Sequence, residues 1–197
     1  MITIIDYNAG NIRSVLRACA EVGAEARITN NPRLVEKAEK IIFPGVGAAP
    51  SAMEYITKNG LDIAIKYAFK EGVPILGICL GAQIILESSE EGPTKCLGLI
   101  AGQTIRFNVT DHSLKIPHMG WNEVKVVKPH PLLEGIRPGD QFYFVHSYYP
   151  NPSDTMNRYA VSDHGGEFCC ALGYKNLFAA QFHPEKSGRF GLELLQR

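Results

Sequence analysis

Residues 73–81 read Val-Pro-Ile-Leu-Gly-Ile-Cys-Leu-Gly, and this stretch decides the fold. An apolar run that ends in small-x-nucleophile-x-small is typical of a strand that turns sharply into a helix. Glycines flank such a corner because a Cβ atom there would collide with neighbouring backbone. Cys79 lies near the amino end of the predicted helix, whose unpaired N–H groups and dipole favour the thiolate. Taken alone, the stretch also fits a buried core cysteine beside a tight turn.

The chain before this corner alternates strand and helix patterns. Apolar runs at 2–5, 26–29, 40–43 and 75–78 predict strands. Helices are expected after Asn11, whose side chain can cap the first turn, from Pro32, and over 61–69. Strand–helix units of this length predict a three-layer α/β fold, in which helices cover both faces of a mostly parallel sheet.

The C-terminal half has a different pattern. From about residue 97 to 181 the segments are short, β-rich and broken by Gly, Pro, Asn and Asp. Additional, antiparallel strands are expected in this half, with strand patterns at 104–107, 123–127, 142–145 and 158–161. Another strand is expected at 177–182, before a helix from about Gly188. No long low-complexity linker separates the halves, so residues 1–197 are expected to form a single domain.

Composition excludes several classes of function. The chain has 20 Lys plus Arg and 20 Asp plus Glu, and this balance argues against nucleic acid as a ligand. The longest apolar stretch, 73–86, is interrupted by Gln83 and is shorter than the ~20 residues of a membrane span. The five cysteines are an odd number without paired or metal-ligand spacing, so reduced thiols in a cytoplasmic protein without a metal or cofactor are expected.

A nucleophilic cysteine needs a base, and the base needs a group that holds its tautomer. His183-Pro184-Glu185 offers both, directly after an apolar strand at the sheet edge where α/β folds bind their ligands. On an extended backbone, residues two apart point to the same side, so the Glu185 carboxylate would reach the imidazole. A polar surface turn is the alternative interpretation of these three residues.

Acyl transfer to a cysteine also needs donors for the tetrahedral oxyanion. The backbone N–H of Leu80, directly after the nucleophile, is one expected donor. A second is expected from the loop 44–47, Pro-Gly-Val-Gly, whose small residues let the main chain approach a ligand. That loop fits neither the dinucleotide nor the P-loop fingerprint, so it is interpreted as an oxyanion or substrate loop.

The motifs at 44–47, 77–83 and 183–185, in this order, resemble those of the class I (triad) glutamine amidotransferases. The resemblance covers essentially the whole chain. It implies a nucleophile, a general base and an orienting carboxylate, which are Cys79, His183 and Glu185. The implied chemistry is a γ-glutamyl thioester, release of ammonia, and hydrolysis to glutamate without a cofactor. By motif position, the elements that hold glutamine and its oxyanion are Val46, Gly47, Leu80, Gln83, His146, Ser147 and Tyr148.

Residues 115–122, Lys-Ile-Pro-His-Met-Gly-Trp-Asn, and the opening at 5–12 resemble one branch of this family. That branch comprises the glutaminase subunits of imidazole glycerol phosphate synthase in histidine biosynthesis. The resemblance implies L-glutamine as substrate and a (β/α)8-barrel cyclase subunit as the partner in a heterodimer. Trp121, the only tryptophan, suits an interface anchor, although it also fits packing within a β-hairpin. The expected interface residues are Asn11, Pro117, His118, Met119, Trp121 and Asn122.

Two departures from the family pattern leave alternatives open. Residues 48–53 are smaller than the family pattern, and Ala82 replaces a methionine after the corner. A related glutaminase that feeds another ammonia acceptor, such as one in an amidino-sugar pathway, fits these departures. A stand-alone cysteine hydrolase would use the same corner but would need no docking surface. Three other histidines, His112, His130 and His164, are expected to be solvated, and Cys169 and Cys170 to fill the core from opposite faces of a strand.

Overall fold

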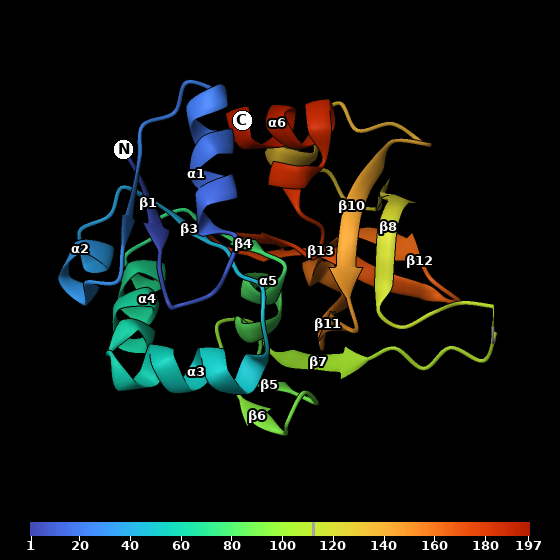
Figure 1. The fold of residues 1–197 in the computed structure, drawn as a ribbon, viewed down its shortest axis with the longest axis horizontal. Helices are drawn as coiled ribbons and strands as arrows, with labels where there is room; N and C mark the ends of the chain where they lie inside the picture. Colours follow the sequence, from blue (N-terminus) through green and yellow to red (C-terminus); the bar gives the residue numbers. More distant parts are fainter. Residues whose placement is uncertain (112) are drawn as a thin grey trace.

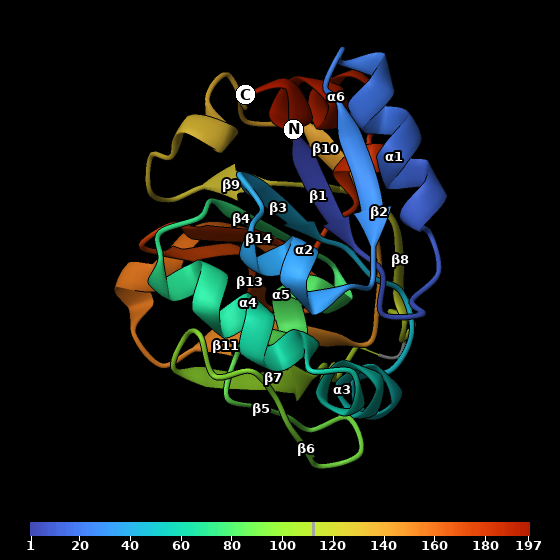
Figure 2. The same cartoon turned by 90° about the vertical axis from the view of Figure 1, so that its left-hand side faces the viewer.

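The computed structural model describes residues 1–111 and 113–197. Its main sheet has eight strands in the order β2-β1-β3-β4-β14-β13-β12-β9 (Figures 1 and 2). The parallel part comprises β1 (Ile2–Ile5), β2 (Ala26–Thr29), β3 (Lys40–Phe43), β4 (Ile75–Ile78) and β14 (Leu177–Ala180). The antiparallel part comprises β13 (Glu167–Tyr174), β12 (Arg158–Asp163) and β9 (Lys125–Val126). The predicted α/β sheet, parallel first and antiparallel in the C-terminal half, is confirmed.

Helices cover both faces of this sheet, as Figures 1 and 2 show. One face carries α1 (Ile12–Glu21) and α6 (Gly188–Gln196). The other carries α2 (Pro32–Glu36), α3 (Ala49–Lys58), α4 (Leu61–Lys70) and the short α5 (Leu80–Ile84). Single turns of 3-10 helix lie at Pro131–Leu133, Thr155–Asn157 and Pro184–Lys186. Separate apolar clusters fill the space on the two sides of the sheet. Within the described ranges, no helix is both long and apolar enough to cross a bilayer.

Two smaller sheets lie beside the carboxyl ends of the parallel strands. One is an antiparallel pair of β8 (His118–Glu123) and β10 (Gln141–His146). The other joins β11 (Tyr148–Pro152), β7 (Gly102–Arg106), β5 (Ser88–Ser89) and β6 (Thr94–Lys95). The chain passes from the first small sheet to the second at a single residue, Ser147. Residues of both sheets line part of the cavity described below.

Several local expectations differ from the structure. The strand expected at 123–127 is divided at Val124 between β8 and β9. Helix α3 was not predicted, although Pro50 in its first turn is a typical helix-opening signal. Asn11 does precede α1, but its backbone is left-handed, with φ 74°, and its side chain makes no capping hydrogen bond. That side chain is instead committed to a tertiary contact with Glu185.

Two of the histidines expected to be solvated, His130 and His164, are half-buried and packed on one side. His130 stacks on Phe178 with ring centroids 4.2 Å apart, and His164 stacks on His118 at 4.3 Å. An imidazole ring presents an apolar face, so polar neighbours in the sequence do not prevent such packing. His112 lies outside the described residues. Cys169 and Cys170 are buried in different apolar clusters, as a strand with period two requires.

Candidate active site

Cys79 sits on a sharp corner between β4 and α5. Its backbone adopts φ 52° and ψ −105°, which a non-glycine residue seldom takes. The glycines on either side are required by space. A Cβ on Gly81 would lie 1.9 Å from the carbonyl oxygen of Phe43, and one on Gly77 would lie 2.9 Å from Ala179 Cβ. The corner predicted from the sequence is therefore present, with the cysteine at its apex.

His183 and Glu185 meet beside this corner, at the carboxyl end of β14. His183 Nδ1 lies 2.7 Å from Glu185 Oε1, and both side chains are almost completely buried. Because a carboxylate only accepts, Nδ1 carries the proton and Nε2 is left for chemistry. The extended backbone assumed from the sequence is wrong, since Pro184 begins a 3-10 turn. The tight turn nevertheless brings the carboxylate back to the imidazole.

The electrostatic setting of His183 reflects two opposing effects. Burial alone lowers the pKa of its imidazole, because the charged form loses water. The Cys79 thiolate and the Glu185 carboxylate outweigh burial and raise the pKa of His183 well above its usual value. Among the described residues, His183 Nε2 has no hydrogen-bond partner although it is buried. The site therefore favours the charged form of the His183 imidazole.

Two polar side chains that the sequence argument missed as parts of the site support these groups. The amide of Asn11 donates from Nδ2 to Glu185 Oε1. Gln181, fully buried, donates from Nε2 to Cys79 Sγ across 3.5 Å. A polar residue two positions before His183, within an otherwise apolar strand, was the signal available for Gln181. For Asn11 no local signal existed, because its partner lies at the other end of the chain.

A cavity of about 470 Å³ opens in front of Cys79. Its walls include every residue expected to hold glutamine, namely Val46, Gly47, Leu80, Gln83, His146, Ser147 and Tyr148. Two charged residues that were not predicted, Glu91 and Lys186, also line it. Glu91 follows the short strand β5, and its position could not be read from local sequence. The cavity thus brings together the motifs at 44–47 and 77–83 and the strand end at Tyr148, and the buried His183 lies beside Cys79.

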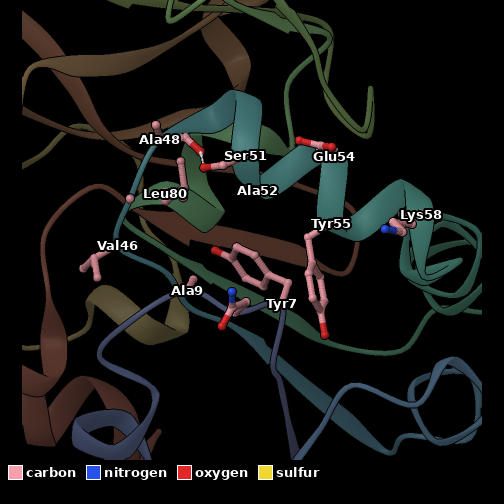
Figure 3. A pocket seen from close by; sticks show the side chains of 12 residues that line it. Tyr7, Ala9, Val46, Ala48, Ser51, Ala52, Glu54, Tyr55, Lys58 and Leu80 are labelled. Atoms are coloured by element: carbon pink, nitrogen blue, oxygen red, sulfur yellow. Dashed lines mark hydrogen bonds between the residues drawn. The ribbon is translucent and has the colours of Figure 1, made fainter.

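The expected oxyanion donor is engaged in this conformation. The backbone N–H of Leu80 donates to the carbonyl oxygen of Gly45 across 3.3 Å. One residue earlier, the carbonyl of Pro44 accepts from the buried hydroxyl of Tyr7. Figure 3 shows Tyr7 in a second cavity, of about 320 Å³, that shares Val46, Gly47 and Leu80 with the first. The glycine loop is therefore a partition between two cavities, and it covers the donor.

Residues 3–197 match the family described as "Glutamine amidotransferase class-I". The chain belongs to this family. Two of its relatives are each named "Imidazole glycerol phosphate synthase subunit HisH". The protein from Dehalococcoides mccartyi is 46% identical over 100% of this chain and 95% of its own length. The protein from Desulfovibrio desulfuricans is 48% identical over 99% of this chain and 92% of its own length.

Solved structures agree on the fold of this glutamine amidotransferase. A chain of the PurLQS structure from Thermotoga maritima aligns with a TM-score of 0.76 at 20% identity, covering 99% of this chain and 95% of that one. A structure titled as a glutamine amidotransferase aligns with a TM-score of 0.71 at 19% identity, covering 99% of both chains. At this identity the likeness concerns the fold alone.

The expected interface residues of this glutamine amidotransferase do not all face outward. Pro117, Met119 and Trp121 are exposed, the last two by 64% and 54%. His118 is only 5% exposed and Asn122 is half-buried, because successive residues of β8 alternate between the two faces of the sheet. His118 therefore does not present its side chain at the surface. Asn11 is half-buried and contacts Glu185.

Proposed function

We propose that this chain is the glutaminase subunit of an imidazole glycerol phosphate synthase. In this role it hydrolyses L-glutamine to glutamate and passes the ammonia to a (β/α)8-barrel cyclase subunit. The observation that carries the proposal is the position of Cys79, which lines the cavity, beside the buried His183–Glu185 pair. The relatives named as HisH subunits, which match over the full chain, support the choice of partner.

The first half of the reaction forms a thioester. His183 Nε2 takes the thiol proton, and Cys79 Sγ attacks the side-chain amide carbon of glutamine. The tetrahedral intermediate then collapses as its C–N bond breaks. The imidazolium of His183 gives its proton to the departing nitrogen, which leaves as ammonia. Glu185, held in turn by Asn11, fixes the tautomer of His183 and stabilises its charged form.

The second half regenerates the enzyme. A water molecule loses a proton to His183 and attacks the thioester carbon. When the C–S bond breaks, the Cys79 sulfur recovers the proton and glutamate is released. Gln181 keeps a donor on the sulfur, which stabilises the thiolate formed in both halves.

The cavity has the character of an amino-acid site. We assign Gln83, His146, Ser147 and Tyr148 to holding the glutamine chain, and the carboxylate of Glu91 to its α-ammonium group. Val46 and Gly47 lie where the loop can contribute an oxyanion donor beside Leu80 N–H. A cavity lined by both an acidic and a basic side chain suits a free amino acid, which carries both charges.

The partner is assigned two tasks, docking and activation. The exposed side chains of Met119 and Trp121, with Pro117, Asn122 and Asn11, are the expected contact surface of a heterodimer. Activation would consist of moving the Gly45 carbonyl away from Leu80 N–H. The pair would then act as an ammonia-transferring lyase in the cytoplasm, where five unpaired cysteines are stable. The whole of residues 1–197 would serve as one glutamine amidotransferase domain.

The test is glutamate release by the chain alone, with a barrel cyclase subunit, and with that subunit plus phosphoribulosyl-formimino aminoimidazole carboxamide ribotide. We expect low activity alone and strong stimulation in the complex. Fast hydrolysis without a partner would favour a stand-alone cysteine hydrolase. Stimulation only by a different acceptor enzyme would favour the amidino-sugar alternative. The names of both reported relatives favour neither alternative.

A further inference from the structure

A line of hydrogen-bonded polar side chains begins on β8 and leads to the glutamine cavity. Asn122 Nδ2 lies 3.1 Å from His118 Nε2, and His118 Nδ1 lies 2.9 Å from His146 Nε2. His146 Nδ1 in turn lies 2.8 Å from the carbonyl oxygen of Tyr148. Within the described ranges, no group of three or more His, Cys, Asp or Glu side chains is arranged to hold a metal ion. These rings are therefore hydrogen-bonding groups.

The line continues from Tyr148 to the nucleophile. The carbonyl oxygen of Tyr148 also accepts from Gln83 Nε2 at 2.9 Å. Gln83 Nε2 donates as well to Gln181 Oε1 at 3.0 Å, and Gln181 Nε2 reaches Cys79 Sγ. Every member is thus linked to the next, from a strand of the expected docking surface to the reacting sulfur.

The hydrogen-bond partners at the two ends fix every proton in the line. A carbonyl oxygen only accepts, so His146 must carry its proton on Nδ1 and leave Nε2 as an acceptor. His118 must then donate from Nδ1 and accept at Nε2. Asn122 donates to the carbonyl oxygen of Asp163 and accepts from the N–H of Glu123, which orients its amide for donation to His118. From Asn122 to His146 the bonds therefore all point towards the Tyr148 carbonyl, which also accepts from Gln83.

Burial keeps both rings in the required neutral state. It lowers the pKa of His118 to about 4 and that of His146 to about 3. His164, stacked on His118, and the nearby imidazole of His183 add to this effect. At neutral pH neither ring gains a second proton, so the direction of the line is preserved.

This line of hydrogen bonds connects the two small sheets. β8 and β10 form a sheet of their own, with His118 directly opposite His146. Met119 and Trp121 project from the outer face of that sheet, and the histidine pair lies on its inner face. Tyr148 belongs to the other small sheet, beyond the single connecting residue Ser147. The bond from His146 to Tyr148 therefore spans the junction between the two sheets.

We infer that the His118–His146 pair transmits occupancy of the outer face of β8 to the glutamine cavity, by setting the position of the Tyr148 carbonyl and with it Gln83. This inference rests on the proposed function, because it takes the barrel subunit as the occupant of that face. His118 and His146 are positioning residues in this scheme, since they act on glutamine through Tyr148 and Gln83. The imidazole rings of His118 and His146 are packed among aromatic side chains and cannot reorient freely. A shift of the β8–β10 sheet therefore also moves the Tyr148 carbonyl in the cavity.

The test compares two amides at position 118 in the full chain with the barrel subunit. In His118→Asn the amide can stand where Nδ1 stood and still donate to His146. In His118→Gln the amide stands nearer the position of Nε2, and the bond to His146 is lost. With saturating partner, we expect His118→Gln to lose about tenfold in kcat/KM for glutamine, mainly through KM. His118→Asn should remain within about twofold of the unchanged chain, and partner Kd should be similar for all three.

Controls separate the possible outcomes. His130→Gln replaces another ring-stacked histidine, outside the line, and should leave stimulation by the partner unchanged. If the unchanged chain is not stimulated by the barrel subunit, the proposed function itself fails. If that chain is stimulated and the two amides at position 118 behave alike, the transmission role of the histidine pair is refuted. Thermal melting of each variant identifies losses that come from unfolding.

A second measurement needs no variant. Two-bond nitrogen–proton NMR spectra of the histidine-labelled chain report which ring nitrogen carries the proton. We expect Nδ1–H on both His118 and His146 at neutral pH, and a change in both signals when the barrel subunit binds. An Nε2–H tautomer on His118, or histidine signals that do not change when the barrel subunit binds, would overturn the inference.

Discussion

The backbone N–H of Leu80 donates to the carbonyl oxygen of Gly45 across 3.3 Å. Leu80 follows the nucleophile, so its N–H is the donor that the corner offers to a tetrahedral oxyanion. While Gly45 accepts this bond, the donor is not available to the substrate. The glycine loop must therefore move before efficient catalysis, and whatever holds the loop controls the basal rate.

Tyr7 holds this loop through a hydroxyl that donates to the Pro44 carbonyl. Burial, reinforced by the charge of Cys79, raises the pKa of Tyr7 well above its usual value, so the hydroxyl keeps its proton. Tyr7→Phe keeps the ring and removes the donor. We expect the free energy of unfolding to fall by about 1 kcal/mol. If moving the loop costs about 1 kcal/mol less, glutamate release without the partner should rise roughly fivefold.

The matched control for Tyr7 is Tyr55→Phe. Tyr55 lines the same cavity from α3 (Figure 3). Among the described residues, its hydroxyl makes no hydrogen bond to the glycine loop, unlike that of Tyr7. Its loss of a hydroxyl should leave the basal rate unchanged. A basal rate in Tyr7→Phe equal to or below that of the unchanged chain would show that Tyr7 does not restrain the loop.

Asn11 is expected to matter for the rate and little for glutamine affinity. Its amide donates to Glu185 Oε1, and Glu185 Oε2 has no hydrogen-bond partner among the described residues. In Asn11→Ala the carboxylate that orients His183 loses this donor, so kcat should fall about tenfold while KM changes little. Steady-state kinetics at saturating partner measures both constants.

The control for Asn11 shares its backbone strain. Asn8 lies in the same loop and also has a left-handed backbone, with φ 62° against 74° for Asn11. Asn8→Ala therefore introduces the same conformational penalty without touching Glu185. An equal loss of kcat in both variants would assign the effect to the loop conformation rather than to the amide.

Trp121 and Met119 are expected to carry the docking energy. Both are large apolar side chains exposed on one face of β8, and Trp121 packs edge-on against Tyr143. Trp121→Ala should raise the Kd for the barrel subunit by roughly tenfold or more, while Cys79 is still alkylated by a glutamine analogue. Tyr67→Ala on α4, another exposed aromatic, should leave the Kd unchanged. Tight assembly by Trp121→Ala would place the contact elsewhere.

The corner around Cys79 was predictable because its requirements are local. The nucleophile, its flanking glycines and the preceding strand are contiguous, and a Cβ at Gly81 would collide with backbone. The His183–Glu185 pair was predictable for the same reason, because the two residues are only two positions apart. The sequence argument assumed an extended backbone between them, whereas the structure has a 3-10 turn that begins at Pro184. The parallel strands were recognisable from short apolar runs for the same reason.

The contacts that support the catalytic side chains were not predictable from local pattern. Gln181 meets Cys79 across 102 positions of sequence, and Asn11 meets Glu185 across 174. Such pairs depend on where the strands come to lie in the sheet. His118 is buried because successive side chains of β8 point to opposite faces of the sheet. The large apolar side chains of this strand lie on the exposed face, so the sequence did not indicate which face is buried. The residue types in the motifs therefore indicated the chemistry, whereas the supporting contacts depend on tertiary packing.

Because His118 on β8 and His146 on β10 are buried in the neutral form, we expect the folded chain to lose stability in acid. The pKa values of His118 and His146 are lowered to about 4 and about 3, from an ordinary value of 6.5. Between pH 6.5 and 4 the unfolded chain therefore binds protons that the folded chain refuses, so acidification favours unfolding. Each ring contributes up to about 1.4 kcal/mol per pH unit to this slope. Urea denaturation at several pH values should show a shallower slope for His118→Phe than for Met119→Ala, and equal slopes would contradict the burial of a neutral ring.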